Sequence, residues 1–260
     1  LALLEHPHFQ DKHNQSHRVS AQSLSSLTLE VLASAFQVSA ENPLVGLQGR
    51  WQLLQKLGHV LEKYEDVFKG RLGNLYQIIL AQDKHTEVVL AENIFAQVLK
   101  YFSEIWPPRL QIDGVNLGDV GRHECVKGPG KSQGLVPFHK LSQWLSYSLV
   151  ESFELCGFAV EGVNQLTGLA EYRNGGLFLD SGLLSLKDPA LATQEHAMDS
   201  QLMVEWRALT IVLLDKLATQ VKEHLDQKQL SLGQILQGGS WAAGRQLAFQ
   251  KRTDGQSPLL

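Results

Sequence analysis

The segment LTGLAEYRNGGLFLD, residues 166–180, places a carboxylate, a phenol and a guanidinium beside two glycines. Glu171, Tyr172 and Arg173 follow an apolar lead and come just before Gly175-Gly176, where a ligand can approach the backbone closely. A buried carboxylate at this point could act as a general base or stabilise an oxocarbenium ion. A structural Glu–Arg pair that braces an irregular loop explains the same residues equally well.

A second polar group lies on one face of a helix that Pro137 is expected to start. Lys140, Gln143 and Tyr147 are spaced i, i+3 and i+7 and therefore share that face. A lysine in the first turn, beside free backbone N–H groups, can complete an anion site. A solvated surface lysine is the alternative. The apolar face is predicted to contain Phe138, Leu141, Trp144, Leu145, Leu149 and Phe153.

Two further groups of charged residues are candidates for supporting roles. Asp119, Arg122 and His123 could clamp a substrate, but no third ligand stands at metal-binding spacing, so we expect no metal site. Glu205 and Arg207 interrupt a strongly apolar helix, and an unpaired buried charge is costly. We expect the two to pair or to brace Glu171 or Arg173.

Composition limits the classes of function. The chain has 260 residues, 43% of them hydrophobic and 19% charged, which is typical of a globular protein. A formal net charge of -4 argues against general nucleic-acid binding. No apolar run approaches the length of a membrane span, and only Cys125 and Cys156 are present, so we expect reduced cysteines in a cytoplasmic protein.

Apolar periodicity predicts an all-α fold in a single domain over residues 1–260. Glycine-rich stretches at residues 109–134 and 157–189 are predicted to be irregular, apart from a weak two-residue alternation in GLFLD. The pair Gly238-Gly239 is predicted to end one helix in a tight turn before another begins. Helices are expected at residues 23–37, 47–64, 87–106, 137–153 and 202–225.

Six blocks, in order, resemble the uracil catabolism protein four family over about residues 36–245. They are FQVSAENPLVGLQGRWQLLQKLG, IWPPRLQIDGVNLGDVGRH, LVPFHKLSQWLSYSLVE, LTGLAEYRNGGLFLDSGLL, VEWRALTIVLLD and LQGGSWAAGR. The resemblance implies a role in a pyrimidine-degradation route that passes through ribosylated, ring-opened uracil to urea. Gly121 departs from the tryptophan expected in GDVWRH. The family's N-terminal RWRHF and DAGAG motifs are not in this sequence, so we expect that the chain lacks an N-terminal region and that part of the pocket lies outside it.

A more distant resemblance joins this chain to queuosine salvage proteins, which hydrolyse an N-glycosidic bond. Their blocks PFYKRAQ, LTMFADYRVPQ and EIRA are similar to PFHKLSQ, LTGLAEYRNGG and EWRA here. The match implies a helical fold like that of helix-hairpin-helix DNA glycosylases. It gives Lys140 the place of a substrate-binding lysine facing a 5′-phosphate and Glu171 the place of the catalytic aspartate. We expect His139, Tyr172 and Arg173, beside them, to contact the substrate.

The resemblances together predict a hydrolase that cleaves the N-ribosyl bond of a ribosylurea-type nucleotide. Its substrate is a small ribosyl or ribosyl-phosphate compound, and the reaction needs no cofactor, metal, nucleic acid or membrane. Two alternatives remain. One is a non-catalytic partner of the pathway's cyclohydrolase-like enzyme, and the other is a salvage glycosidase for a modified nucleoside.

Overall fold

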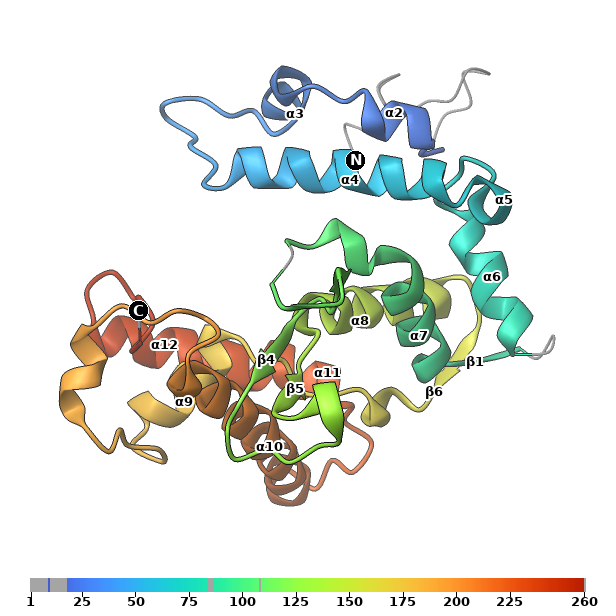
Figure 1. Cartoon of the computed structure of the whole chain (residues 1–260). Helices are drawn as coiled ribbons and strands as arrows, with labels where there is room; N and C mark the ends of the chain where they lie inside the picture. The colour runs from blue at the N-terminus through green and yellow to red at the C-terminus, as the bar shows by residue number, and fades with distance from the viewer. Residues whose placement is uncertain (1–8, 10–17, 84–86, 108, 260) are drawn as a thin grey trace. The chain divides into compact units, whose positions relative to one another are not determined.

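A computed structural model describes residues 9, 18–83, 87–107 and 109–259 and is mostly helical (Figure 1). Its contacts group the chain into two compact units where the sequence predicts a single domain. The first unit comprises Leu1–Val89 and Asn93–Pro107, and the second comprises Leu90–Glu92 and Pro108–Leu260. Every candidate site residue belongs to the second unit.

The first unit is built on α4 (Leu47–Lys63), along which α2 (Ala21–Ser25) and α3 (Leu29–Ala35) lie (Figure 1). The single helix predicted at residues 23–37 is therefore wrong. Thr28 divides it, because the Thr28 side chain accepts the backbone N–H of Val31 and starts a new helix. The prediction at residues 47–64 is confirmed by α4.

Three buried aromatic side chains pack together in the first unit. The ring of Phe68 stacks on Phe102 with centroids 5.7 Å apart and meets Tyr101 edge-on at 5.2 Å. These rings come from α5 (Glu65–Phe68) and α7 (Ala91–Phe102), with α6 (Asn74–Gln82) between them in sequence and η2 (Ser103–Ile105) after them. Strand β1 (Val88–Leu90) replaces the start of the long helix predicted at residues 87–106.

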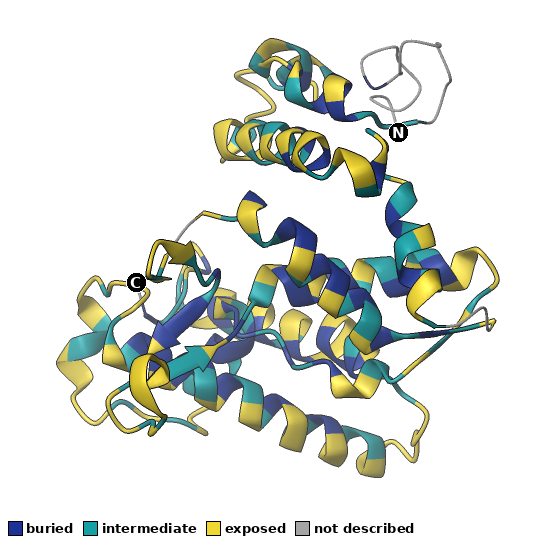
Figure 2. Cartoon of the chain, turned by 45° about the vertical axis from the view of Figure 1, so that its right-hand side comes forward, coloured by how far each residue is buried: buried dark blue, intermediate teal, exposed yellow. Residues whose placement is uncertain are grey.

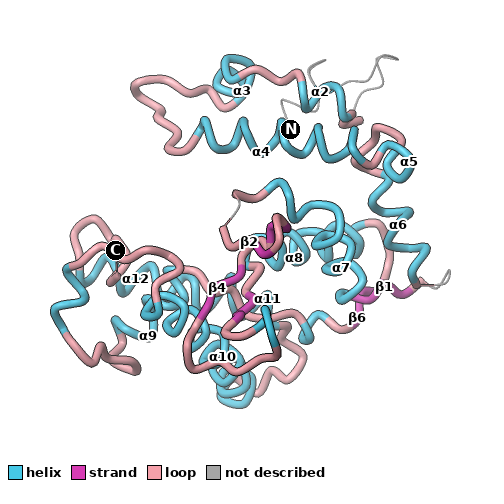
Figure 3. Tube along the Cα trace, viewed as in Figure 1, coloured by secondary structure: helices cyan, strands magenta, loops and turns pink. Residues whose placement is uncertain are grey.

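The second unit contains short antiparallel strands, three of them within residues 109–134, which were predicted to be loop, and a fourth that includes Pro137, where a helix was expected to start. Strand β2 (Gln111–Ile112) pairs with β3 (Val115–Asn116), and β4 (Val120–Arg122) pairs with β5 (Leu135–Pro137) (Figure 3). The short helix η3 (Gly130–Ser132) lies between β4 and β5 in sequence. A Cβ on Gly121, in β4, would lie 2.7 Å from Cγ2 of Val204, so the tryptophan expected at this position could not fit beside Val204 as it packs here.

The helices of the second unit enclose a core around α10 (Gln201–His224), which confirms the helix predicted at residues 202–225. Helix α9 (Tyr172–Asp180) lies within residues 157–189, which were predicted to be irregular, and it includes GLFLD. The expected turn at Gly238-Gly239 is also wrong, since η6 (Leu236–Ser240) is a π-helix that continues directly into α12. The other elements are α8 (Lys140–Leu155), β6 (Ala159–Glu161), η4 (Val163–Gln165), α9 (Tyr172–Asp180), η5 (Pro189–Thr193), α11 (Leu232–Ile235) and α12 (Trp241–Lys251).

Buried and exposed positions alternate around the long helices (Figure 2), and α8 buries a face different from the predicted one. Leu141 is 37% exposed and Trp144 is 51% exposed. Polar side chains are buried in their place, together with Val150 and the predicted core residue Phe153; they are Ser142, Gln143 and Ser146. The hydrophobic pattern alone therefore misplaced the inward face of α8.

Candidate active site

Asp119 joins three segments of the second unit through one carboxylate. Oδ1 and Oδ2 accept from Nη2 of Arg207 at 2.9 and 2.7 Å, and Oδ1 also accepts from Nη1 of Arg109 at 3.0 Å. Oδ2 accepts the backbone N–H of Lys140 at 3.0 Å. Burial alone would raise the pKa of Asp119, but the bonds and charge of Arg207 with these other donors hold that pKa below its ordinary value. Asp119 is therefore an anion that fixes the start of α8 to α10.

Arg207 has a partner different from those the sequence suggested. It is only 5% exposed, pairs with Asp119, and lies over the ring of Phe138 with 4.0 Å from Cζ to the centroid. Glu205 is exposed on α10. Arg109 is a residue that the sequence reasoning did not select, since it stands at the start of a stretch predicted to be loop.

The backbone turns sharply just before Lys140. His139 has a φ of 47°, and the backbone N–H groups of Phe138 and His139 both donate to the carbonyl of Asp119, at 2.9 and 3.0 Å. Burial lowers the pKa of His139, while the charge on Asp119 opposes that shift. Burial also lowers the pKa of Lys140, against the opposing charges of Glu171 and Asp119. Lys140 is therefore a half-buried cation at the N-terminus of α8 and not a fully solvated lysine.

Glu171 is the N-cap of α9 and is 8% exposed. Oε2 accepts the backbone N–H of Arg173 at 3.0 Å, and Oε1 accepts that of Asn174 at 2.7 Å. Burial raises the pKa of Glu171, while these two N–H groups and the charge on Lys140 oppose the rise. The charge on each of Lys140 and Glu171 opposes the effect of burial on the pKa of the other.

Asn174 and Ser240 hold the capped turn in place through side-chain bonds that sequence reasoning did not predict. Asn174 is buried, its Nδ2 donates to the carbonyl of Leu169 at 3.0 Å, and its Oδ1 accepts from Oγ of Ser240 at 2.8 Å. The N–H of Glu171 also donates to the carbonyl of Leu169, at 2.8 Å. The carboxylate therefore sits on a backbone that is bonded on both sides.

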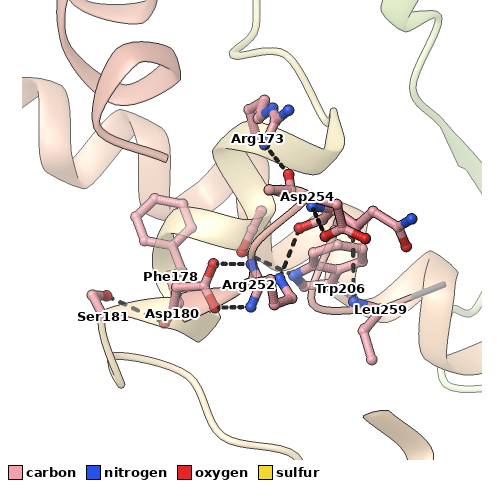
Figure 4. Close-up of polar contacts among 12 residues, drawn as sticks. Arg173, Phe178, Asp180, Ser181, Trp206, Arg252, Asp254 and Leu259 are labelled. Carbon is pink, nitrogen blue, oxygen red and sulfur yellow. Dashed lines mark hydrogen bonds and ion pairs between the residues drawn. The ribbon is translucent and has the colours of Figure 1, made fainter. Parts of the chain in front are cut away.

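Arg173 makes its bonds toward the C-terminal segment. Its Nη1 donates to the carbonyl of Gly255 at 2.6 Å (Figure 4). Its Cζ lies 4.7 Å from the ring centroid of Tyr172, which is exposed. Below it in Figure 4, Asp180 accepts two bonds from Arg252, at 2.8 and 2.6 Å. Arg173 also lowers the pKa of Glu171 through its charge.

Arg122 and His123 are occupied within their own loop. The exposed Arg122 donates from Nη1 to the carbonyl of Gln133, and Nδ1 of His123 accepts the N–H of Cys125 at 3.2 Å. Of the predicted clamp, Asp119 alone is joined to the start of α8. In the described part of the chain, no three His, Cys, Asp or Glu side chains gather as a metal site would require. Within the same residues, no helix is both long and apolar enough for a membrane span.

Comparison with known proteins identifies the family. The family model described as "Protein of unknown function (DUF1688)" matches residues 1–260. The chain belongs to this family. It is 38% identical to Uracil catabolism protein 4 of Lachancea kluyveri over 272 residues, which cover 94% of this chain and 62% of that protein.

A second relative matches with similar identity and coverage. Protein urg3 of Schizosaccharomyces pombe is 37% identical over 249 residues, which cover 94% of this chain and 59% of that protein. The chain thus spans about three-fifths of the length of these two curated relatives. The family resemblance seen in the six sequence blocks is confirmed.

Proposed function

We propose that this chain hydrolyses the N-ribosyl bond of a ribosylurea-type nucleotide in uracil catabolism. The buried carboxylate of Glu171, fixed by two backbone N–H groups at the start of α9, is the observation that carries the proposal. The name of the relative Uracil catabolism protein 4 suggests the pathway, and the resemblance to queuosine salvage proteins suggests the bond type. The helical character of the chain agrees with that resemblance.

The reaction needs one carboxylate close to C1′ of the ribose. The C1′–N bond breaks, its electron pair leaves on the urea nitrogen, and positive charge develops on C1′ and the ring oxygen. An ionised Glu171 stabilises this charge and accepts a proton from the attacking water, while the departing urea nitrogen takes a proton from solvent water and Glu171 afterwards returns its proton to solvent. Water oxygen then forms the new bond to C1′. Atoms and charge balance without a metal or cofactor.

The two helix-capping bonds to Glu171 leave lone pairs of its carboxylate available for the reaction. A carboxylate offers about four lone-pair sites, and the N–H groups of Arg173 and Asn174 use one on each oxygen. Burial raises the pKa of Glu171, which makes the ionised form a stronger base. The same two bonds fix the direction of the carboxylate, and catalysis of this kind depends on such positioning.

Lys140 would supply the charge that holds the 5′-phosphate. It is the first residue of α8, at the positive end of the helix dipole. Its N–H is held by Asp119, which is held in turn by Arg207 and Arg109. Phe138, two residues before Lys140, packs in one cluster with Ala170, the residue before Glu171, so a phosphate there would lie near the segment that carries Glu171.

Replacing Glu171 tests the proposal. We expect Glu171→Gln to lower the rate of urea release from ribosylurea 5′-phosphate by at least about 100-fold, because the base and the stabilising charge are both lost. A urease-coupled assay measures the release. In the wild type, activity should rise with pH as Glu171 ionises, with a midpoint above the ordinary 4.5, and should fall on the alkaline side below the ordinary 10.5 as Lys140 loses its proton.

Two variants separate catalysis from helix capping. Glu171→Asp keeps a carboxylate that caps a helix well, so its thermal midpoint should stay near that of the wild type while urea release falls. Glu154→Gln changes an exposed glutamate on α8 and should leave the rate unchanged. Full activity in Glu171→Gln would refute the proposal. Turnover of other ribosides in a panel, but not of ribosylurea, would support a salvage glycosidase instead.

A further inference from the structure

The polar face of α8 runs beside the segment that leads to Glu171. Near the start of α8, Phe138 shares a buried cluster with Ala170. Farther along the helix, the hydroxyl of Tyr147 donates to the carbonyl of Thr167 at 3.1 Å. Helix α8 and the segment before Glu171 therefore run in opposite directions. Lys140 lies toward Glu171, and Tyr147 lies toward Thr167.

Gln143 lies between these two contacts. It is spaced three residues from Lys140 and four from Tyr147, so it shares their face of the helix. It is 5% exposed, and its Oε1 is buried without a hydrogen-bond partner in the structure. Oγ1 of Thr167 is buried and unpartnered in the same way. Native proteins rarely leave such groups unsatisfied, and a ligand that supplies the missing bonds is one cause.

We propose that Gln143 determines substrate specificity by binding the ureido end of the ligand, with Thr167 as its neighbour in the subsite. This inference rests on the proposed function, which supplies the ribosylurea substrate. Oε1 of Gln143 accepts an N–H from the terminal nitrogen of the ureido group. The ureido carbonyl accepts from the Gln143 amide or from the Thr167 hydroxyl, since both side chains carry donors.

The arrangement gives each end of the substrate a separate recognition element. Lys140 lies at the phosphate end, Glu171 lies at the bond that breaks, and Gln143 lies deeper along α8. A site built to bond an N–H group discriminates strongly against an analogue that lacks it, because the buried acceptor is then left unpaired. A buried glutamine with only a packing role would change stability but would not discriminate between such ligands.

Two ligands test the proposal by equilibrium binding. One is ribosylurea 5′-phosphate, and the other is its N′,N′-dimethyl derivative, whose terminal nitrogen has no N–H. Binding of both ligands is measured by calorimetry with the Glu171→Gln variant, in which we expect neither ligand to be hydrolysed. We expect that chain to prefer the first ligand by about 10-fold or more. Adding Gln143→Met should remove the preference by weakening the first ligand about 10-fold while leaving the second unchanged.

Controls keep a folding defect apart from a binding defect. Gln250→Met changes an exposed glutamine on α12 and should alter neither affinity nor thermal midpoint. Thr167→Val should weaken the first ligand about 3- to 10-fold, and Thr167→Ser should restore it because the hydroxyl returns. If Gln143→Met loses its cooperative thermal transition, the two Thr167 variants test the proposal in its place.

The outcomes separate this inference from the proposed function. If the wild type releases urea but the preference survives Gln143→Met, the inference is wrong and the function stands. If the wild type releases no urea but binds with a preference that depends on Gln143, the function is wrong and the inference stands. Equal binding of the two ligands, or binding of neither, overturns the inference.

Discussion

Asp119 illustrates how one side chain can set the geometry of a whole site. Its carboxylate receives donors from Arg109, Arg207 and the backbone of Lys140. Arg207 is buried, so its charge is tolerable only while a counter-ion is present. Lys140 takes its place from this network and not from its own side chain. Asp119 is thus a positioning residue.

Removing the charge of Asp119 should therefore be costly. We expect Asp119→Asn to lower the free energy of unfolding at neutral pH by about 3 kcal/mol, because Arg207 is left as an unpaired buried cation. The pKa of Asp119 is lowered in the folded state, so its contribution is complete above the ordinary 3.8 and is lost as pH falls through the folded value. Urea unfolding of the wild type should show this acid loss, and the variant should lack it.

Asp113 provides the matched control. It forms an ion pair with Lys131 in which the two side chains are 67% and 70% exposed. Exposed pairs contribute little, so Asp113→Asn should leave the unfolding midpoint close to that of the wild type at all pH values. Equal effects of the two substitutions would mean that burial does not set the strength of the Asp119 pairs.

Sequence reasoning selected charged residues for a candidate site but not the bonds that connect them. Glu171 and Lys140 were selected because charge stood beside glycines or at a helix start, which are local features. Arg109 and Ser240 were missed because their bonds, to Asp119 and Asn174, join segments far apart in the chain. Gln143 was placed on the correct polar face, but its burial depends on which side of α8 packs inward.

At the scale of elements, the contact between α9 and α12 determines the wall that carries Glu171. Gly244 makes this contact possible. A Cβ on Gly244 would lie 2.1 Å from the backbone oxygen of Arg173, far inside van der Waals distance. The two helices approach at a residue adjacent to the capped turn, so a shift of α12 would also move the N–H groups that bind Glu171.

A methyl group at Gly244 should separate these helices. We expect Gly244→Ala to lower the free energy of unfolding by about 1–3 kcal/mol through overpacking, despite the better helix propensity of alanine. Urea denaturation measures the change. Gly238→Ala is the control, since a Cβ there meets nothing within 4 Å and alanine should be neutral or stabilise by up to about 1 kcal/mol. A neutral Gly244→Ala would show that α12 can shift without cost.

Elements with a long apolar stripe could be predicted from the sequence, and short ones could not. Both α4 and α10 match their predicted ranges closely because periodicity accumulates over many turns. Helix α9 was hidden because Gly175 and Gly176 lie in its interior, where a Cβ on Gly175 would meet Trp206 at 2.8 Å. Its glycines serve close packing and not a turn, and a single sequence does not distinguish these uses.

At the scale of the whole chain, each compact unit has a buried core of its own. Phe68 lies fully buried against Tyr101 and Phe102 in the first unit, and Phe178 lies in the core of the second. The prediction of one domain rested on the absence of a linker-like composition. Two compact units can belong to one domain, so this expectation stays a prediction.

Separate cores should respond separately to damage. We expect Phe68→Ala to cost about 3–5 kcal/mol and to speed amide hydrogen exchange in residues 18–83 and 93–107, with little change in residues 109–259. Exchange followed by mass spectrometry resolves these segments. Phe178→Ala should give the reverse pattern. Faster exchange throughout the chain in both variants would show that the two units unfold as one.

The π-helical turn at Leu236–Ser240 makes this stretch intolerant of insertions and deletions. An α-helix closes its ring from residue i to i+4 and a π turn closes it to i+5, so the turn holds one residue more than a regular helix would. If the π turn persisted after the deletion of Gly238 or Gly239, every later side chain would rotate by about 100°. Ser240 would turn away from Asn174, and Gly244 would turn away from the Arg173 carbonyl. A one-residue gap here between family members would therefore alter the support of Glu171, and not only the length of a connection.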